Sequence, residues 1–108
     1  MRLVIIESPY AGDIQLNTLY ARACVRDSLA RGEAPFASHL LYTQEGILDD
    51  ADEEERMHGI KAGLMWGARA DLTAVYIDRG ISRGMRYGIA IAEELKRPIE
   101  RRSIEGWK

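Results

Sequence analysis

The chain has one cysteine, three prolines, one phenylalanine and two histidines among its 108 residues. The lone Cys24 excludes an internal disulfide, so nothing points to an oxidising compartment, and we expect a cytoplasmic protein. The two histidines, His39 and His58, do not have the spacing of a metal-binding motif, and we expect no metal site. No stretch approaches the roughly 20 apolar residues that a membrane span requires, so we expect no membrane partner.

The chain also lacks an excess of either charge, with 15 basic and 17 acidic residues. Without a basic excess it has no general attraction for a nucleic-acid backbone, and we expect no nucleic-acid partner. The acidic run from Asp49 to Glu55 lacks the spacing of a calcium-binding loop and is better explained as a solvated loop leading into a helix. The length is that of one domain, which we expect to cover residues 1–108.

What is present is an alternation of apolar runs and helical patterns. Strands are predicted over residues 2–7, 35–42, 72–78 and 98–104, and helices over 13–31, 53–70 and 82–96, with Asp13 and Ser82 as N-caps. The unbroken apolar run Leu3–Ile6 is typical of a central parallel strand, whereas the last strand opens with Pro98 and is expected at an edge. This order predicts a single-domain α/β three-layer sandwich of about four parallel strands with helices on both faces.

Two of the predicted helices carry informative surfaces. The first is apolar around most of its circumference, and its polar stripe contains only Gln15, Arg22 and Arg26. One sheet face cannot bury that much apolar surface, so we expect a homo-oligomer. In the second helix the predicted inward face consists of Met57, Ile60, Leu64 and Ala68.

The loops after the first and third strands are the predicted ligand site, because neighbouring parallel strands open at the same edge of a sheet. Tyr10 follows the first strand, where it can stack on a ring of the ligand or simply cover the sheet edge. His39 is either a core histidine or a group facing the crevice, and the sequence leaves both open. The long polar loop 43–52 is a candidate lid.

The candidate ligand-binding residues are Ser8, Tyr10, Gly12, Asp13, His39, Tyr42, Asp78, Gly80, Ser82, Arg83, Gly84 and Met85. Some of these have a structural alternative: Gly12 and Asp13 fit a turn before a helix, and Gly84 fits a close contact between helix and sheet. Arg83 fits either a phosphate contact or a surface charge. Neither a dinucleotide-binding fingerprint nor a P-loop occurs, and we expect no cofactor.

Several segments together resemble a small uncharacterised family common in phages and prophages: Ser8–Asp13, Ala34–Tyr42, Ala62–Trp66, Asp78–Met85 and Arg97–Ile99. That family is similar to the nucleoside 2-deoxyribosyltransferases, whose flavodoxin-like, Rossmann-like fold binds a nucleoside between an early aromatic loop and a late helix start. By this resemblance Tyr10 is the base-stacking aromatic, Asp78 lies near the sugar-binding acids, and Gly84 is the glycine of the late motif.

One position departs from the transferase pattern. Counted back from Arg97, the nucleophilic glutamate of the transferases corresponds to Gly88, which has no side chain. Glu93 and Glu94 lie more than a helical turn further along. The resemblance therefore implies binding without turnover, with no catalytic residue.

The expected ligand is a nucleoside- or nucleotide-derived small molecule, such as ADP-ribose or a cyclic nucleotide. A phage protein of this kind would sequester a host immune signal in the host cytoplasm. Two alternatives stay open. One is a nucleoside 2-deoxyribosyltransferase or N-glycosidase that uses Asp78 or another acid, and the other is a structural oligomeric subunit with a vestigial crevice.

Overall fold

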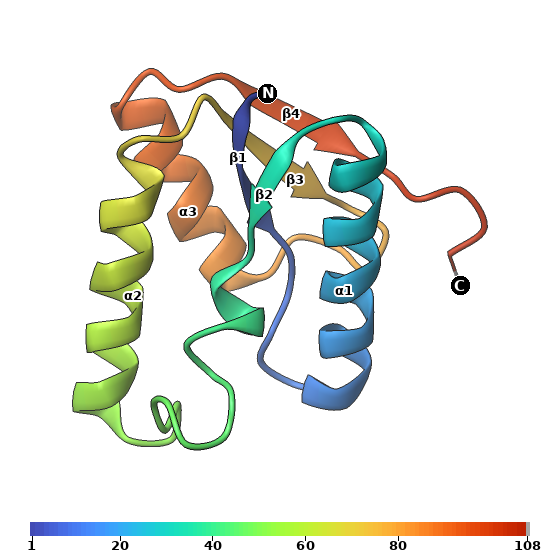
Figure 1. The fold of residues 1–108 in the computed structure, drawn as a ribbon. Helices are drawn as coiled ribbons and strands as arrows, with labels where there is room; N and C mark the ends of the chain where they lie inside the picture. Colours follow the sequence, from blue (N-terminus) through green and yellow to red (C-terminus); the bar gives the residue numbers. More distant parts are fainter. Residues whose placement is uncertain (108) are drawn as a thin grey trace.

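The computed structural model describes residues 1–107 and contains one four-stranded sheet (Figure 1). The strands are β1 (Leu3–Glu7), β2 (Ala34–Phe36), β3 (Leu72–Tyr76) and β4 (Ile99–Arg102). Their order is β2-β1-β3-β4, and every neighbouring pair is parallel. The predicted parallel sheet is therefore confirmed, with β4 at an edge as expected.

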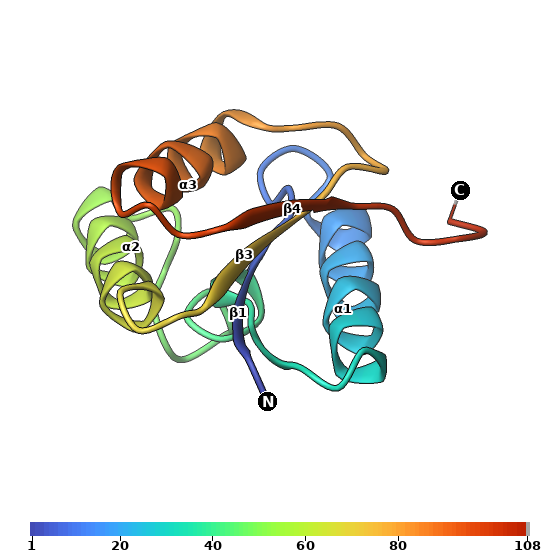
Figure 2. The same ribbon diagram turned by 90° about the horizontal axis from the view of Figure 1, so that it is seen from above.

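Helices cover both faces of the sheet. They are α1 (Ile14–Ala30), α2 (Glu53–Gly67) and α3 (Arg83–Glu94), together with a short 3-10 helix η1 (Ser38–Leu40). Helix α1 lies on one face, and α2 and α3 lie on the other (Figure 2). The predicted caps are present: the Asp13 carboxylate accepts from the backbone N–H of Leu16 at 3.1 Å, and Ser82 Oγ accepts from that of Met85 at 3.2 Å.

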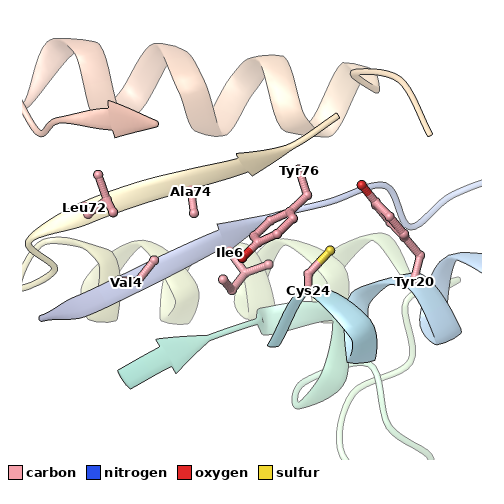
Figure 3. Close-up of a cluster of buried hydrophobic side chains, with 7 residues drawn as sticks. All are labelled: Val4, Ile6, Tyr20, Cys24, Leu72, Ala74 and Tyr76. Atoms are coloured by element: carbon pink, nitrogen blue, oxygen red, sulfur yellow. The ribbon is translucent and has the colours of Figure 1, made fainter. Parts of the chain in front are cut away.

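The hydrophobic core forms where alternate residues of β1 and β3 meet α1 (Figure 3). Its buried members are Val4, Ile6, Tyr20, Cys24, Leu72, Ala74 and Tyr76. Because side chains alternate across a strand, Leu3, Ile5 and Glu7 of β1 point to the other face, where Ile5 lies beside Gly67 of α2 and Glu7 beside Gly88 of α3. This places the last residue of β1 on the same side of the sheet as α3.

The prediction of a long second strand is wrong beyond Phe36. Only Leu3, Val4 and Ile5 of β1 pair with β2, and the chain then turns into η1. Local hydrogen bonds replace the ladder there: Leu40 N–H donates to the Ala37 carbonyl at 3.0 Å, and Thr43 Oγ1 donates to the His39 carbonyl at 2.6 Å. His39 and Tyr42 therefore lie outside the strand.

The predicted inward face of the second helix is also wrong. Met57, Ile60 and Ala68 of α2 are exposed and Leu64 is half-buried, and the other residues turned inward include Gly59, Gly63 and Gly67. A Cβ at Gly59 would lie 3.2 Å from Leu48 Cδ1, so the Leu48 side chain would have to move by a few tenths of an ångström to admit it. Helix α2 thus turns its glycines inward and leaves most of its large apolar side chains exposed.

The apolar surface of α1 is only partly covered. Leu19 and Leu29 are each more than half exposed in the single chain. The expected homo-oligomer, for which these side chains are the basis, stays a prediction.

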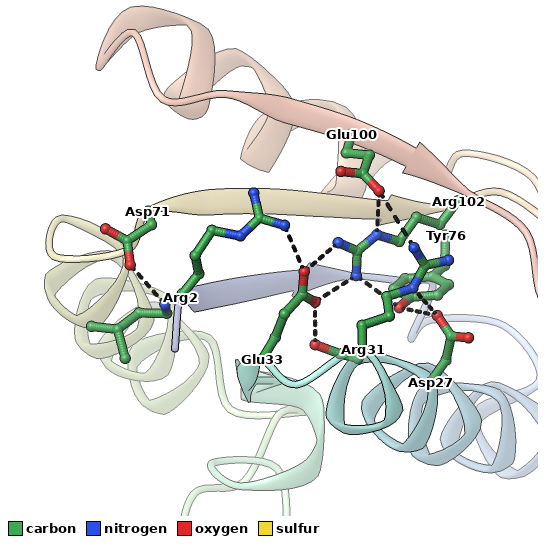
Figure 4. A network of polar contacts seen from close by, with 10 residues as sticks. Arg2, Asp27, Arg31, Glu33, Asp71, Tyr76, Glu100 and Arg102 are labelled. Carbon is green, nitrogen blue, oxygen red and sulfur yellow. Dashed lines mark hydrogen bonds and ion pairs between the residues drawn. The ribbon is translucent and has the colours of Figure 1, made fainter.

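A buried polar network joins β4 to the loop before β2 (Figure 4). Arg102 is 3% exposed, although the sequence suggested only a charged edge strand. Its guanidinium donates to both carboxylate oxygens of Glu33, at 2.8 and 2.7 Å, and to the Tyr76 hydroxyl at 3.2 Å. Ser28 and Arg2 donate to the same carboxylate, which is therefore fully paired.

Replacement of Glu33 tests this network. Hydrogen bonds from Arg102 lower the pKa of Glu33 from 4.5 to about 2, against the opposing effect of burial. Glu33→Gln is therefore expected to lower the unfolding free energy by about 3 kcal/mol at pH 7, measured by urea denaturation. The difference should shrink as the pH falls from 4.5 towards 2, because the wild-type carboxylate then takes up a proton. The exposed Glu94→Gln is the control, and an equal loss in both variants would contradict the role of Glu33.

Candidate functional site

The candidate site lies at the carboxyl ends of β1 and β3. These strands are neighbours, and their following connections lead to opposite edges of the sheet, β2 on one side and β4 on the other. A parallel sheet opens a crevice at such a switch point. The loops that the sequence singled out, 8–13 and 77–82, both begin there (Figure 1).

Asn17 holds these two loops together, and the sequence analysis missed it. Its side-chain amide donates to the carbonyls of Tyr10 and Ala11, each at 3.1 Å. Its Oδ1 accepts from Arg79 Nε at 2.8 Å. Asn17 lies between the apolar residues Leu16 and Tyr20 of α1 and is buried, and a buried amide requires partners.

Tyr10 and His39 form the aromatic wall of the site. Their rings stack with centroids 4.9 Å apart and planes inclined by 22°. Burial lowers the pKa of His39, with a smaller opposing effect from Asp50, so the imidazole is neutral at pH 7. His39 lies in η1 rather than in a strand and contacts Tyr10, and its part in ligand binding stays a prediction.

An open hollow of about 730 Å³ lies beside this wall. Tyr10 and Ile14 line one side, and the loop from Thr43 to Ala51 lines the other. The hollow is acidic because Glu45, Asp49, Asp50 and Glu55 lie around it. Such a rim favours a neutral or cationic ligand over one that brings several phosphates.

Most other predicted site residues have structural contacts. Ser8 and Met85 are buried, and Asp13 and Ser82 cap helices. Gly12 and Gly80 have φ values of +98° and +84°, which turns require. The Tyr42 ring packs against Phe36, and Arg83 and Gly84 are exposed at the start of α3. Their part in ligand binding stays a prediction.

The carboxylate of Asp78, the residue predicted to lie near the sugar-binding acids, already accepts hydrogen bonds from other residues of the protein. It accepts from the Tyr20 hydroxyl at 2.6 Å, from Ile104 N–H at 2.9 Å and from the Ser103 hydroxyl. Burial alone would raise the pKa of Asp78, but hydrogen bonds from Ser103 and Tyr20 outweigh it and lower the pKa. These contacts tie the segment after β4 to the end of β3.

Gly88 faces a carboxylate. A Cβ built on Gly88 would lie 2.1 Å from Glu7 Oε2 and 2.5 Å from Glu7 Cδ. No real side chain fits at such distances, so the Glu7 carboxyl fills the space that a residue at position 88 would take. A close contact between α3 and the sheet occurs at Gly88, with Glu7 as its partner, but the contact predicted at Gly84 is wrong because Gly84 is exposed and a Cβ there would have no neighbour within 4 Å.

Glu7 is a second residue that the sequence analysis missed. Burial raises the pKa of Glu7 from 4.5 to about 8, and the positive field of Arg97 opposes that rise only in part. Arg97 is engaged elsewhere: its Nε donates to Thr73 Oγ1 at 2.8 Å, and its Nη1 donates to the Gly67 carbonyl at 2.5 Å. The ion pairs within residues 1–107 do not include Glu7.

Comparison with known proteins identifies the family. The family described as a domain of unknown function, DUF7768, matches residues 2–102. The chain belongs to DUF7768. No curated protein matches this DUF7768 chain.

Among solved structures, this DUF7768 protein is similar to the 2-deoxyribosyltransferase of the psychrotolerant bacterium Bacillus psychrosaccharolyticus. The TM-score is 0.68 at 22% identity, and the match covers 98% of this chain and 75% of the other. The flavodoxin-like, Rossmann-like fold expected from the sequence is thereby confirmed. None of the helices within residues 1–107 is both long and apolar enough to cross a membrane.

Glu7→Gln tests the energetic state of this carboxyl. Between pH 4.5 and 8 the native protein holds a proton that the unfolded chain has released, so stability falls with rising pH by about 1.4 kcal/mol per pH unit. Glu7→Gln removes this slope, and we expect it to raise the unfolding free energy at pH 7.5 by about 4 kcal/mol, which is the slope summed from pH 4.5 to 7.5. Denaturant titrations across this pH range measure the effect.

Gly88→Ala and Glu94→Gln complete the test. Gly88→Ala should destabilise the protein by about 1–3 kcal/mol, because its methyl group collides with the Glu7 carboxyl. The exposed Glu94→Gln should change little. A Glu7→Gln protein less stable than wild type at pH 7.5 would mean that the ionised carboxylate has a stabilising partner.

Proposed function

We propose that this DUF7768 protein binds a nucleoside or a nucleoside-derived small molecule at the carboxyl ends of β1 and β3. The observation that carries the proposal is the stacked pair of Tyr10 and His39 beside the hollow. An aromatic wall next to an open, partly apolar space suits a flat heterocyclic base. The similarity in fold to a 2-deoxyribosyltransferase supports the same ligand class.

The acidic rim refines the ligand class. Four carboxylates lie around the hollow, so each additional phosphate on a ligand near the rim adds repulsion. A phosphate is better accommodated on the side of α3, where Arg83 is exposed near the capped helix start. We therefore expect a nucleoside to bind at least as tightly as its 5′-triphosphate.

The protein either retains the bound molecule intact or cleaves it. Retention by a phage protein would sequester a nucleotide-derived immune signal such as ADP-ribose or a cyclic nucleotide. The case for retention rested on the missing side chain at position 88, and the carboxyl of Glu7 now stands in that space.

Binding is tested by thermal-shift and calorimetric titrations with nucleosides, their phosphates, ADP-ribose and cyclic nucleotides. A ligand at 100 times its dissociation constant adds about 2.7 kcal/mol to stability. Tyr10→Ala should weaken binding about tenfold or more, because stacking of a base on an aromatic ring contributes about 1–3 kcal/mol. Tyr87→Ala, at an exposed tyrosine of α3, is the matched control. Equal affinity of the folded Tyr10→Ala and Tyr87→Ala proteins would contradict the assignment.

A further inference from the structure

We propose that the outer face of α2 is the surface through which two copies of this chain form a dimer, with their two α2 helices antiparallel. The surface is the α2 stripe, which consists of Met57, Ile60, Leu64 and Ala68. The proposal concerns the assembly of the chain and does not depend on the ligand proposed above. It also places the contact on a different helix from the homo-oligomer expected from the surface of α1.

The first argument is the spacing of the α2 stripe. Ile60 follows Met57 by three residues, Leu64 follows Ile60 by four, and Ala68 follows Leu64 by another four. Residues with this spacing return to the same side of a helix once per turn, which is the pattern with which one helix packs along another. The sequence pattern alone therefore predicts that this side of α2 is covered.

The second argument is that the single chain leaves the α2 stripe uncovered. Its two largest exposed side chains, Met57 and Ile60, have exposed fractions of 44% and 37%, and the adjoining Met65 is 74% exposed. The inward side of the helix, with Gly59 and Gly63, lies instead against η1 and the loop that follows it. Helix α2 forms one flank of the molecule, and no other helix or strand lies beyond it (Figures 1 and 2). A continuous exposed apolar surface marks an interaction site.

The third argument is the distribution of charge along α2, which favours a second copy as the occupant and sets its direction. Residues 52–55, the N-cap and first turn, are all acidic. Residues 57–70 contain two basic residues, Lys61 and Arg69, and no acidic residue. An antiparallel pair brings the acidic start of each helix beside the basic half of the other, whereas a parallel pair would place acids against acids. A two-fold axis across the helices produces this antiparallel arrangement.

The charges beside the α2 stripe are available for such contacts. Glu54 and Lys61 are both exposed, and the ion pairs within residues 1–107 include neither of them. They lie seven residues apart, about two helical turns, and therefore share one flank of the stripe. With the two-fold axis between Met57 and Ile60, Met57 of each copy meets Ile60 of the other, and Glu54 of each copy lies beside Lys61 of the other.

The exposed leucines of α1 do not form an equivalent surface. Leu19 and Leu29 lie ten residues apart, and the exposed Arg22 and Arg26 stand between them in the helix. Single exposed apolar side chains are common on the surfaces of monomeric proteins, whereas a continuous stripe is not. The α2 stripe is therefore the better contact surface for a second copy.

The test measures the mass of the chain in solution by analytical ultracentrifugation over a range of concentrations. Wild type should be a dimer at about 100 µM. Ile60→Asp should keep its circular dichroism spectrum and raise the dissociation constant of the dimer about 100-fold or more, because each dimer would bury two unpaired carboxylates. Leu19→Asp is the matched control at an exposed position of α1 and should leave the dissociation constant unchanged.

An exchange of charges tests the antiparallel direction. Lys61→Glu should weaken the dimer about tenfold, because it places a second acid beside Glu54 of the other copy, and Glu54→Lys should weaken it similarly. The double variant Glu54→Lys/Lys61→Glu exchanges the two charges and should recover the wild-type dissociation constant to within about threefold. These variants change exposed side chains only, so they decide the question even where Ile60→Asp fails to fold.

Three results would overturn the inference. The first is a wild-type chain that stays monomeric at about 100 µM. The second is a dimer that Leu19→Asp dissociates and Ile60→Asp leaves intact, which would place the contact on α1. The third is a double variant that remains as weak as Lys61→Glu alone, which would exclude the antiparallel arrangement.

Discussion

The parallel pairing of β1 with β3 is the constraint on which the site depends. Ile6 pairs with Ala74 and Glu7 with Val75, so the two strands end almost level. Their loops leave the sheet side by side and are then joined by Asn17, which binds the first loop directly and the second through Arg79. Tyr10 and the start of α3 are thus fixed relative to each other by one ladder and one side chain.

Small residues set the spacing of the layers on the opposite side of the sheet from α1. Helix α2 approaches through Gly59, Gly63 and Gly67, and α3 approaches through Gly88. At Gly88 the glycine admits a carboxyl that a side chain would exclude, whereas a Cβ at Gly63 or Gly67 would make ordinary van der Waals contacts. The consequences differ, because α2 is left with exposed apolar residues such as Trp66, whereas α3 accommodates a carboxyl. Packing through glycine therefore leaves a carboxyl between α3 and the sheet and leaves large apolar side chains of α2 exposed to solvent.

Local patterns predicted the order of the elements, the helix caps and the central strand, because capping and unbroken apolar runs are short-range signals. The inward face of α2 could not be read this way, since glycine adds nothing to a hydrophobic pattern and Met57 and Ile60 dominate it. β2 ends at Phe36 although β1 continues to Glu7, because the chain turns there into η1 through local hydrogen bonds that the apolar pattern does not predict. The contact between Glu7 and Gly88 joins residues far apart in sequence, and the local sequence pattern around either residue does not predict it.

The Glu7 carboxyl and any side chain at position 88 exclude each other, which couples two residues that lie far apart in the sequence. On this backbone a residue larger than glycine at position 88 requires a residue shorter than glutamate at position 7. The effects of substitutions at the two positions on the free energy of unfolding are therefore expected to be non-additive, and a shortened residue 7 should allow a side chain at position 88 that the wild-type protein does not tolerate.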